Sequence, residues 1–323
     1  MTRRPSVEAI IVHHESPATL TRVLETLKQQ DQALDGIVVV DNGSRDEFGH
    51  MQTAHPDVRW VRLPENTGLT HARNAGLAQV TSELVLVLDD DVYLTRGGLR
   101  LMLNAMETTG AAVVCPRILI HPADSLIQCD GASIHFAGML TLNNRDALIS
   151  ETPPLPSDCG AFIGACILAR RQLLTDLGGF DEDYFFYFED LELSYRMRAL
   201  GHRIWCAADA VALHDLGQGT PGLSFRGSGH YPARRAYLTL RHRWITMLLH
   251  FQVRTLLLLS PALALYDLAA FIACVGRGFG REWIGAVRSL LQDLPSLQAR
   301  RRRWQARRTR GDGAILAGGS LPF

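Results

Sequence analysis

The sequence predicts an α/β protein in which a doubly wound, mostly parallel sheet is followed by an α-helical C-terminal extension. Within residues 1–110, short apolar runs alternate with amphipathic helical segments, which is typical of a parallel sheet covered by helices on both faces. Hydrophobic residues make up 47% and charged residues 20% of the 323 residues, as in packed globular proteins. The formal net charge is zero, so the composition does not indicate a nucleic-acid-binding protein.

The first part of the chain supplies the elements of this sheet in order. Apolar runs predict strands at 7–12, 37–40 and 84–88, of which the first is expected to be buried, and residues 58–63 are predicted to form a further, short strand. Apolar residues at helical spacing predict helices at 17–30 and 69–79. Each predicted helix therefore connects two predicted strands, as parallel pairing requires.

The part that follows is less regular. Prolines between 111 and 160 indicate strands and loops there. A strand, a glycine turn and a helix are predicted at 161–170, 178–181 and 191–200. Further on the composition becomes helical and apolar, so we predict a domain of residues 1–235 and an extension of residues 236–323.

Polar side chains follow three of the predicted strands at the points where these strands end. They are His13, His14 and Glu15; Asp41 and Asn42; and Asp89, Asp90 and Asp91. Open α/β sheets bind ligands beyond the carboxyl ends of their strands, so the sequence predicts a ligand site at this edge.

Asp89, Asp90 and Asp91 directly follow an apolar strand, where three adjacent negative charges are unfavourable unless a positive group neutralises them. A divalent cation held by carboxylates, phosphate oxygens and water would do so, and we predict a metal site here. The alternative is a helix N-cap with two solvated neighbours.

A second acidic pair, Glu189 and Asp190, follows the aromatic run 185–188. Contact with aromatic rings removes water from a carboxylate, which raises its proton affinity and makes it a better general base. Because the pair also begins a predicted helix, helix capping is an alternative or additional role. His214 becomes a metal ligand only if the fold brings it to Asp91.

The cysteines and the N-terminus bear on the compartment. The six cysteines show neither a CxxC pair nor a regular spacing, which favours reduced core thiols over a disulfide framework. The apolar run at 9–12 is too short for the core of a signal peptide, so secretion is not expected.

Several of these segments, taken in order, resemble family 2 glycosyltransferases, which have the Rossmann-like GT-A fold. The segments that carry the resemblance are 10–15, 38–44, 66–68, 72–76, 88–91, 178–182 and 188–193. The first of them departs from the family, because His13, His14 and Glu15 stand where a sequence containing tyrosine is commoner.

The resemblance implies a role for each matched residue. Asp190 corresponds to the catalytic base of an inverting transfer, and Asp89, Asp91 and His214 correspond to the ligands of a divalent metal, Mn²⁺ or Mg²⁺. The residues expected beside the nucleotide sugar are His13, Glu15, Asp41, Asn66, Gly68, Arg73, Asp89 and Asp90. Residues 1–110 then form the nucleotide-sugar half and residues 111–235 the acceptor half.

The resemblance also narrows the substrates. Bacterial rhamnosyltransferases of cell-surface polysaccharide synthesis have a similar apolar and basic extension, so dTDP-rhamnose is the first expected donor and UDP-sugars are the next. The expected acceptor is a hydroxyl of a glycan or of a lipid-linked molecule. Two other classes stay open: a catalytically silent scaffold with the same fold, and a nucleotidyltransferase, although the latter usually has a glycine-rich basic loop after its first strand.

The extension contains an apolar segment, 255–275, that is long enough to span a bilayer but is interrupted by Pro261 and Asp267. Basic and aromatic residues suited to lipid head groups lie nearby: Arg241, His242, Arg243, Trp244, Arg254, Arg277 and Arg281. We favour helices that lie on or dip into the membrane over packing on the catalytic domain or a true span. The arginine-rich segment 300–310 either touches anionic lipid or forms a mobile, solvated tail. These features predict a cytoplasmic protein, peripheral at the inner face of the cell membrane, with no nucleic-acid partner.

Overall fold

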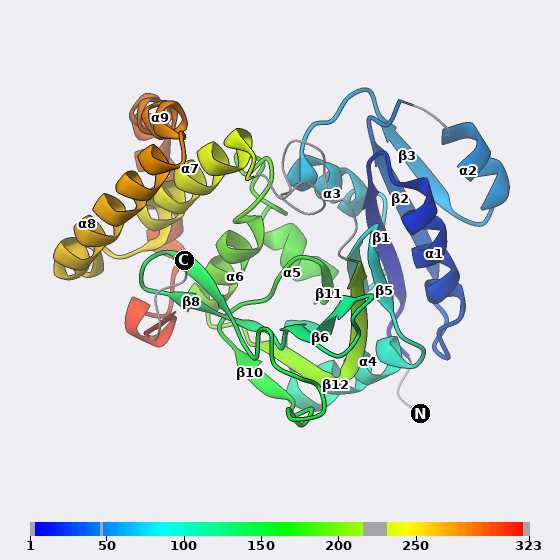
Figure 1. Cartoon of the computed structure of the whole chain (residues 1–323). Coiled ribbons are helices and arrows are strands. Elements are labelled where there is room, and N and C mark those ends of the chain that lie inside the picture. Colours follow the sequence, from blue (N-terminus) through cyan, green and yellow to red (C-terminus); the bar gives the residue numbers. More distant parts are fainter. Residues whose placement is uncertain (1–3, 46–47, 216–230, 319–323) are drawn as a thin grey trace.

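The computed structural model describes residues 4–45, 48–215 and 231–318 (Figure 1). The strands of its main sheet are β1 (Val7–His13), β2 (Gly36–Asn42), β3 (Arg59–Leu63), β4 (Leu84–Asp89), β5 (Val92–Leu94), β6 (Val113–His121), β7 (Ile127–Cys129), β10 (Ser157–Cys159), β11 (Cys166–Arg170) and β12 (Ile204–Asp215). Their order is β10-β12-β6-β11-β4-β1-β2-β3, with β5 paired to β12 and β7 to β6. A small second sheet joins β8 (Ala132–His135), β9 (Met139–Leu142) and β13 (Leu316–Ala317).

We call the part of the chain before the extension the catalytic part. Its helices are α1 (Pro17–Lys28), α2 (Phe48–Ala54), α3 (Leu69–Leu77), α4 (Gly98–Thr109), α5 (Arg171–Asp176) and α6 (Glu189–Ala199). They cover both faces of the sheet, because successive residues of a strand point to opposite faces. Ile11 of β1 packs in a core with α1 and α4, whereas Ile10 packs in a core with α3, α5 and α6. The predicted doubly wound α/β architecture is confirmed.

The strand pairing positions the polar strand ends. β1 pairs in parallel with β2 on one side and with β4 on the other, so the carboxyl ends of all three strands meet at one edge. β11 then pairs antiparallel to β4, and β6 pairs in parallel with β12. The predicted clustering of polar strand ends at one edge is therefore confirmed, whereas the roles of these residues stay predictions.

Some elements differ from the sequence predictions. No element is predicted at 48–54 or 98–109, where the structure has α2 and α4. The strand predicted at 161–170 begins only at Cys166. Its first part is not in the ladder because the backbone of Gly164 bonds to side chains instead: its N–H donates to Asp190 and its carbonyl accepts from Arg73.

The extension contains α7 (Ala233–His250), α8 (Val253–Gly276), α9 (Gly280–Arg307) and a short 3₁₀ helix (Asp312–Ala314). It packs on the catalytic part through a shared apolar core, and β13 returns to pair with β8. The prediction of a mobile arginine tail is wrong, because α9 includes residues 300–307 and Arg300 forms ion pairs with Asp181 and Asp183. All six cysteines are free, as predicted, and five of them are buried.

Candidate active site

The middle acid of the aspartate triplet is tied to β1. Asp90 Oδ2 lies 2.8 Å from His13 Nδ1 and accepts the His14 backbone N–H at 3.3 Å. Burial raises the pKa of Asp90 to about 6, although its hydrogen bond with His13 opposes the shift. His13 and Asp90, both expected beside the nucleotide, are thus brought together and fix the geometry of the strand ends.

The outer acids, Asp89 and Asp91, have different partners. Asp89 Oδ1 accepts a hydrogen bond from Arg73 at 2.7 Å. Asp91 Oδ1 lies 3.4 Å from His214 Nε2, because β5 pairs with β12 in a register that sets Val92 opposite His214. The condition that makes His214 a candidate ligand, its approach to Asp91, is fulfilled by the fold.

Asp91 and His214 offer one carboxylate and one imidazole to a divalent cation. Within the described ranges, no group of three His, Cys, Asp or Glu side chains is arranged to hold a metal by itself. Mg²⁺ sites at phosphate substrates commonly use one or two protein ligands, with phosphate oxygens and water completing the shell. The residues present therefore fit a cation that is bound together with a diphosphate.

The end of β2 contains a buried carboxylate that is only half satisfied. Asp41 Oδ1 accepts the Ser44 backbone N–H at 3.0 Å. Asp41 Oδ2 has Arg62 Nε at 3.5 Å but accepts no hydrogen bond from the described part of the chain. Because buried polar atoms are nearly always hydrogen-bonded, Asp41 Oδ2 is suited to accept an N–H from a ligand.

The loop before α3 is held against both halves of the site. Asn42 Oδ1 accepts the backbone N–H of Thr67 at 3.0 Å, and Asn66 Oδ1 accepts that of Gly68 at 3.1 Å. Gly68 has a φ of +92°, and a Cβ there would lie 2.7 Å from the carbonyl oxygen of Phe185. Asn66 and Gly68 thus shape the loop and bring it to the aromatic run before α6.

Glu15 lies at the rim of this edge. Its Oε1 accepts hydrogen bonds from the Arg45 backbone N–H at 3.0 Å and from Arg45 Nε at 3.2 Å. The residue has a φ of +58°, a conformation that is uncommon for a side chain of this kind. Its expected role beside the nucleotide stays a prediction.

Arg73 joins the two halves of the catalytic part. Its side chain is 1% exposed and donates to Asp89 Oδ1 at 2.7 Å, to Glu189 Oε1 at 3.1 Å and to the Gly164 carbonyl at 2.8 Å. A buried guanidinium requires such partners, since its charge is costly to remove from water. Arg73 therefore fixes the start of α6 relative to the end of β4.

Asp190 lies at the start of α6, beside this contact. Its two carboxylate oxygens accept the backbone N–H groups of Gly164 at 3.3 Å and of Leu191 at 2.7 Å. Burial raises the pKa of Asp190 and outweighs these hydrogen bonds. Burial, and next the charge of Asp190, raise the pKa of the neighbouring Glu189 to about 7. Asp190 remains partly exposed while Glu189 is buried, so Asp190 is the better placed of the two to meet a substrate.

The turn that precedes Asp190 is strained. Tyr187 and Phe188 have φ values of +68° and +72°, which aromatic residues adopt rarely. Strained backbone of this kind persists where the surrounding structure imposes it, and it occurs often at active sites. Here α7 imposes it, because His242 Nδ1 lies 2.9 Å from the Tyr187 carbonyl and Arg235 donates to the Tyr187 hydroxyl at 3.1 Å.

Four residues of α7 that the sequence suggests for a lipid interface instead contact protein. Burial lowers the pKa of His242 to about 4, so the imidazole is neutral and its Nδ1–H donates to Tyr187. Arg241 pairs with Asp293 of α9, while Arg243 and Trp244 both donate to Asp267 of α8. The membrane interpretation of Arg241, His242, Arg243 and Trp244 is therefore wrong.

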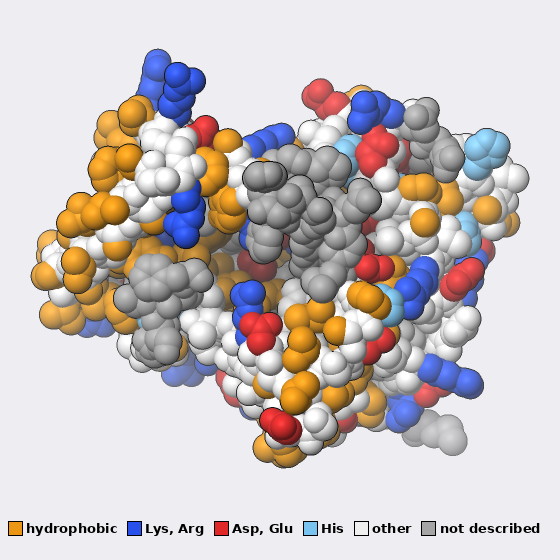
Figure 2. Space-filling view, in the orientation of Figure 1, with side chains coloured by type: hydrophobic (Ala, Val, Ile, Leu, Met, Phe, Trp, Pro, Cys, Tyr) orange, Lys and Arg blue, Asp and Glu red, His pale blue; other side chains and the backbone are white. Residues whose placement is uncertain are grey.

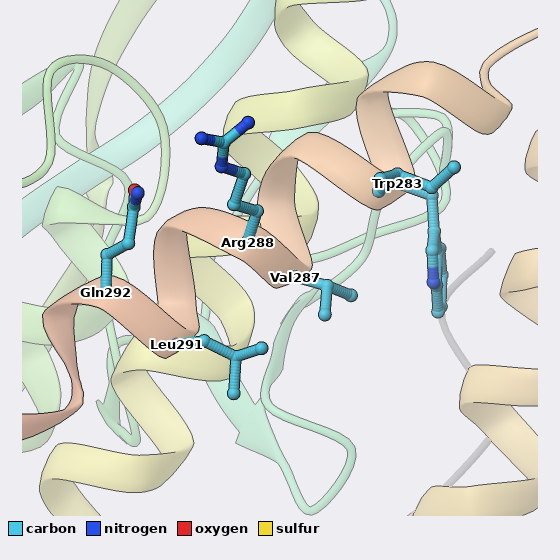
Figure 3. A pocket seen from close by; sticks show the side chains of 6 residues that line it. Trp283, Val287, Arg288, Leu291 and Gln292 are labelled. Atoms are coloured by element: carbon cyan, nitrogen blue, oxygen red, sulfur yellow. The ribbon is translucent and has the colours of Figure 1, made fainter.

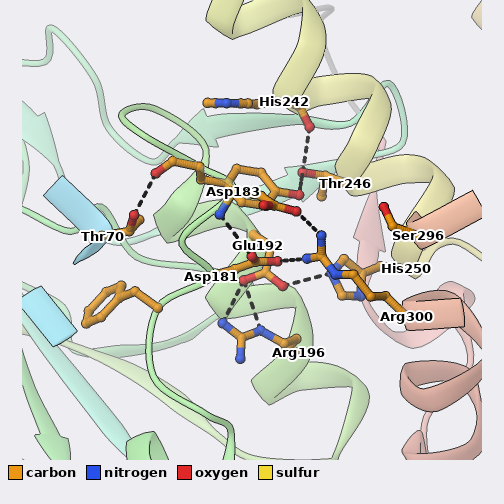
Figure 4. Close-up of polar contacts among 12 residues, drawn as sticks. Thr70, Asp181, Asp183, Glu192, Arg196, His242, Thr246, His250, Ser296 and Arg300 are labelled. Carbon is orange, nitrogen blue, oxygen red and sulfur yellow. Dashed lines mark hydrogen bonds and ion pairs between the residues drawn. The ribbon is translucent and has the colours of Figure 1, made fainter. Parts of the chain in front are cut away.

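An ionic network holds α6 to α7, and the turn before α6 to α9 (Figure 4). Glu192 accepts hydrogen bonds from Arg196 and lies 2.9 Å from His250 Nε2, while Asp181 and Asp183 pair with Arg300. Burial alone would raise the pKa of Glu192, but Arg196 and His250 outweigh it and lower the pKa to about 2. The extension thus supports α6, the helix whose first turn contains Asp190.

We expect Glu192→Gln to lower the free energy of unfolding at neutral pH by about 3 kcal/mol, the value of a pKa shift from 4.5 to about 2. The folded-state pKa lies below the unfolded one, so the stabilisation is present above pH 4.5 and is lost as the pH falls towards 2. Urea unfolding from neutral pH down through this window measures the difference. Glu107→Gln, on the exposed side of α4, is the matched control, and an equal effect of both substitutions would contradict the role of the network.

Comparison with known proteins adds a family to this geometry. The family model described as Glycosyl transferase family 2 matches residues 9–178. The pre-mycofactocin glycosyltransferase of Mycobacterium tuberculosis is 32% identical over 185 residues, which are 55% of this chain and 37% of that protein. The low-salt glycan biosynthesis hexosyltransferase Agl10 of Haloferax volcanii is 25% identical over 76% of each chain. The chain thus spans about a third of the first of these relatives.

Solved structures share the fold. GalNAc-T7 with UDP, GalNAc and Mn²⁺ superposes with a TM-score of 0.62 at 15% identity, over 79% of this chain and 49% of that chain. Residues 1–349 of TarS from S. aureus, in complex with UDP, superpose with a TM-score of 0.56 at 19% identity, over 94% of this chain and 87% of that chain. At these identities the likeness establishes the GT-A fold, as predicted from the sequence.

Proposed function

The chain belongs to glycosyl transferase family 2, and from this membership we propose an inverting transfer of a sugar from a nucleotide diphosphate to an acceptor hydroxyl. Family membership supports a glycosyltransferase and leaves the nucleotidyltransferase alternative without support. The observation that carries the finer proposal is the buried contact of Arg73 with both Asp89 and Glu189. It holds the edge that ends in the aspartate triplet against the start of α6, where Asp190 lies.

Asp190 is the proposed general base. Its raised pKa favours uptake of a proton from the acceptor hydroxyl as the hydroxyl oxygen bonds to the anomeric carbon. The bond from this carbon to the diphosphate breaks on the opposite side, which inverts the anomeric configuration. The two backbone N–H groups on the Asp190 carboxylate fix its orientation for this step.

The diphosphate side of the reaction is assigned to the strand ends. Asp91 and His214 are the proposed protein ligands of Mn²⁺ or Mg²⁺, with Asp89 beside them. A cation there would offset the negative charge that develops on the leaving diphosphate. Two solved GT-A structures contain Mn²⁺, GalNAc-T7 and the mannosyltransferase PcManGT, which supports a divalent cofactor.

The nucleotide base is assigned to the end of β2. Asp41 Oδ2, a buried acceptor, matches the ring N–H that thymine and uracil share. This chemistry supports dTDP-rhamnose or a UDP-sugar as the donor, and the UDP complexes of TarS agree with the second. We further propose a glycan or lipid-linked acceptor, with the protein peripheral at the cytoplasmic face of the membrane.

We expect one nucleotide among dTDP, UDP and GDP to stabilise the protein, and to do so only with Mn²⁺ or Mg²⁺. A ligand at about 100 times its dissociation constant adds about 2.7 kcal/mol to the free energy of unfolding. Thermal unfolding with each nucleotide, with and without metal, measures the effect and identifies the donor base.

Asp91→Asn removes a proposed metal ligand at a partly exposed position, so it should abolish the metal-dependent part of this stabilisation while the protein stays folded. Asp215→Asn, one residue beyond His214, is the matched control and should retain it. Stabilisation that is independent of metal, or that survives in Asp91→Asn, would contradict the proposed metal site.

A further inference from the structure

Helix α8 is apolar on all sides and yet mostly exposed. Its most apolar 18-residue window has a mean hydropathy of 2.0, and 6% of that window is buried within the protein. By length and composition this helix could cross a bilayer. A helix that is apolar all round is normally buried in a protein core or in a membrane, and the part of the chain that the structure describes does not cover α8.

The exposed apolar side chains are continuous over α8 and the first half of α9. Figure 2 shows hydrophobic side chains gathered over both helices. We define this apolar face by its exposed members: Val253, Leu257, Leu258, Leu265, Leu268, Phe271, Ile272, Val275, Ile284, Val287 and Leu291. Leu258, at 81%, is the most exposed of them. Exposed apolar surfaces of this extent mark interaction sites.

On α9 the side chains of Trp283, Val287 and Leu291 form one row, and those of Ile284, Arg288 and Gln292 form the neighbouring row. Val287 and Leu291 point to one side of the helix together with Trp283, whereas Arg288 and Gln292 point to the other (Figure 3). These side chains line a shallow depression of about 530 Å³ on the helix surface. Aromatic and basic residues beside an apolar strip are typical of helices that lie at the boundary between lipid head groups and acyl chains.

The polar interruption of α8 is turned away from the apolar face. Asp267 Oδ1 accepts hydrogen bonds from Arg243 and from Trp244 Nε1 of α7, the latter at 3.1 Å. The apolar face therefore contains no uncompensated acid from α8. The same contact argues against a span, because α8 would have to carry this ion pair and the charged helix α7 into the bilayer.

The positive charge around the apolar face indicates which kind of partner it binds. Residues 253–310 contain eleven arginines and three acids, a net charge of +8. The exposed arginines of this segment are Arg254, Arg277, Arg281, Arg288, Arg302, Arg303, Arg307 and Arg310. A second copy would bring an equal positive charge against this face, whereas an anionic lipid surface complements it.

We propose that α8 and the first half of α9 form a docking face that lies in the plane of an anionic lipid bilayer. The apolar face enters the boundary of the acyl chains, and the exposed arginines contact lipid phosphates. This inference deepens the membrane association that is part of the proposed function. It rests on the proposed function only where it concerns a lipid-linked acceptor.

The test is flotation of the full chain with vesicles of phosphatidylcholine, alone or mixed with phosphatidylglycerol. The chain should bind the mixed vesicles more strongly, and added salt should weaken that binding. Leu258→Glu with Ile272→Glu should lower the partition coefficient about 100-fold or more, since insertion of one such side chain contributes a factor of about 10 to 100. Leu148→Glu with Leu155→Glu is the matched control, because these leucines are exposed on the catalytic part, and its binding should be unchanged.

Equal binding of both variants would overturn the proposal, as would a wild-type chain that binds neither kind of vesicle. A concentration-dependent dimer that the α8 glutamates abolish, without vesicle binding, would assign the face to a second copy. Retention in the membrane after alkaline extraction would overturn the in-plane arrangement. Stabilisation by nucleotide should be the same in the wild type and in all of these variants. If the wild type shows no such stabilisation, that result counts against the proposed transfer reaction and not against membrane docking.

Discussion

Asp190→Asn is expected to lower kcat by about 10²- to 10⁴-fold, the usual contribution of a positioned general base. Asparagine has nearly the same shape, and its single amide oxygen can still accept one of the two N–H groups that fix this side chain, that of Leu191 at 2.7 Å. It cannot take up the proton of the acceptor hydroxyl. Nucleotide binding, measured by thermal stabilisation, should therefore change little, and the loss should appear in kcat.

The pH dependence of the same reaction gives an independent check. A base must be ionised to act, so the rate should fall as the pH drops through the pKa of Asp190. Burial raises this pKa above 3.8, and the acidic limb should lie correspondingly higher than for an exposed aspartate. Asp176→Asn, on the exposed side of α5, is the control for the substitution itself. Equal loss of transfer and of nucleotide binding in Asp190→Asn would exclude the role as base.

The sequence was sufficient for the elements that have a strong local signal. The apolar runs of β1, β2 and β4 are buried on both sides, so their positions follow from composition alone. The polar residues at the strand ends could be grouped because parallel strands bring their carboxyl ends together. α4 escaped prediction although Leu99, Met102 and Met106 have helical spacing, since Gly97 and Gly98 before them suggest a turn.

The contacts that the predicted site residues make with distant parts of the chain could not be predicted from local sequence patterns. Arg73 meets Glu189 across 116 positions of sequence, and no local pattern encodes such a contact. The left-handed turn at Tyr187 and Phe188 is equally hidden, because its sequence is a plain aromatic run and its strain is imposed by His242 of α7. Only a folded chain shows that the extension holds this turn.

The extension shows how composition can mislead. Arg243 and Asp267 looked like a head-group contact and a membrane-incompatible acid, respectively. In the fold Arg243 and Asp267 form an ion pair with each other. Neither residue is therefore evidence for or against contact with lipid. The apolar exposed surface of α8 remains, and it is the feature that composition did predict.

Arg73→Met is expected to lower the free energy of unfolding by about 3–5 kcal/mol, the usual cost of removing one partner from a buried ion pair. Methionine fills much of the space of the arginine stem but leaves Asp89 and Glu189 without their shared cation. Burial and the charge of Asp190 already raise the pKa of Glu189 to about 7, and Arg73 opposes this shift. In Arg73→Met the pKa of Glu189 should rise further, because no opposing charge remains.

The stability loss in Arg73→Met should therefore depend on pH. Protonation of Glu189 relieves the uncompensated charge, so the difference from wild type should be larger above pH 7 than below it. Urea unfolding on both sides of neutral pH measures this. Arg100→Met is the matched control, since Arg100 pairs with Asp31 at 2.9 Å on the surface, where ion pairs contribute little. If Arg73→Met were as stable as Arg100→Met, Arg73 could not be what holds the start of α6 to the end of β4. If Arg73→Met is destabilised as expected, adding Glu189→Gln should recover part of the lost stability. The second substitution removes the negative charge that Arg73 neutralises.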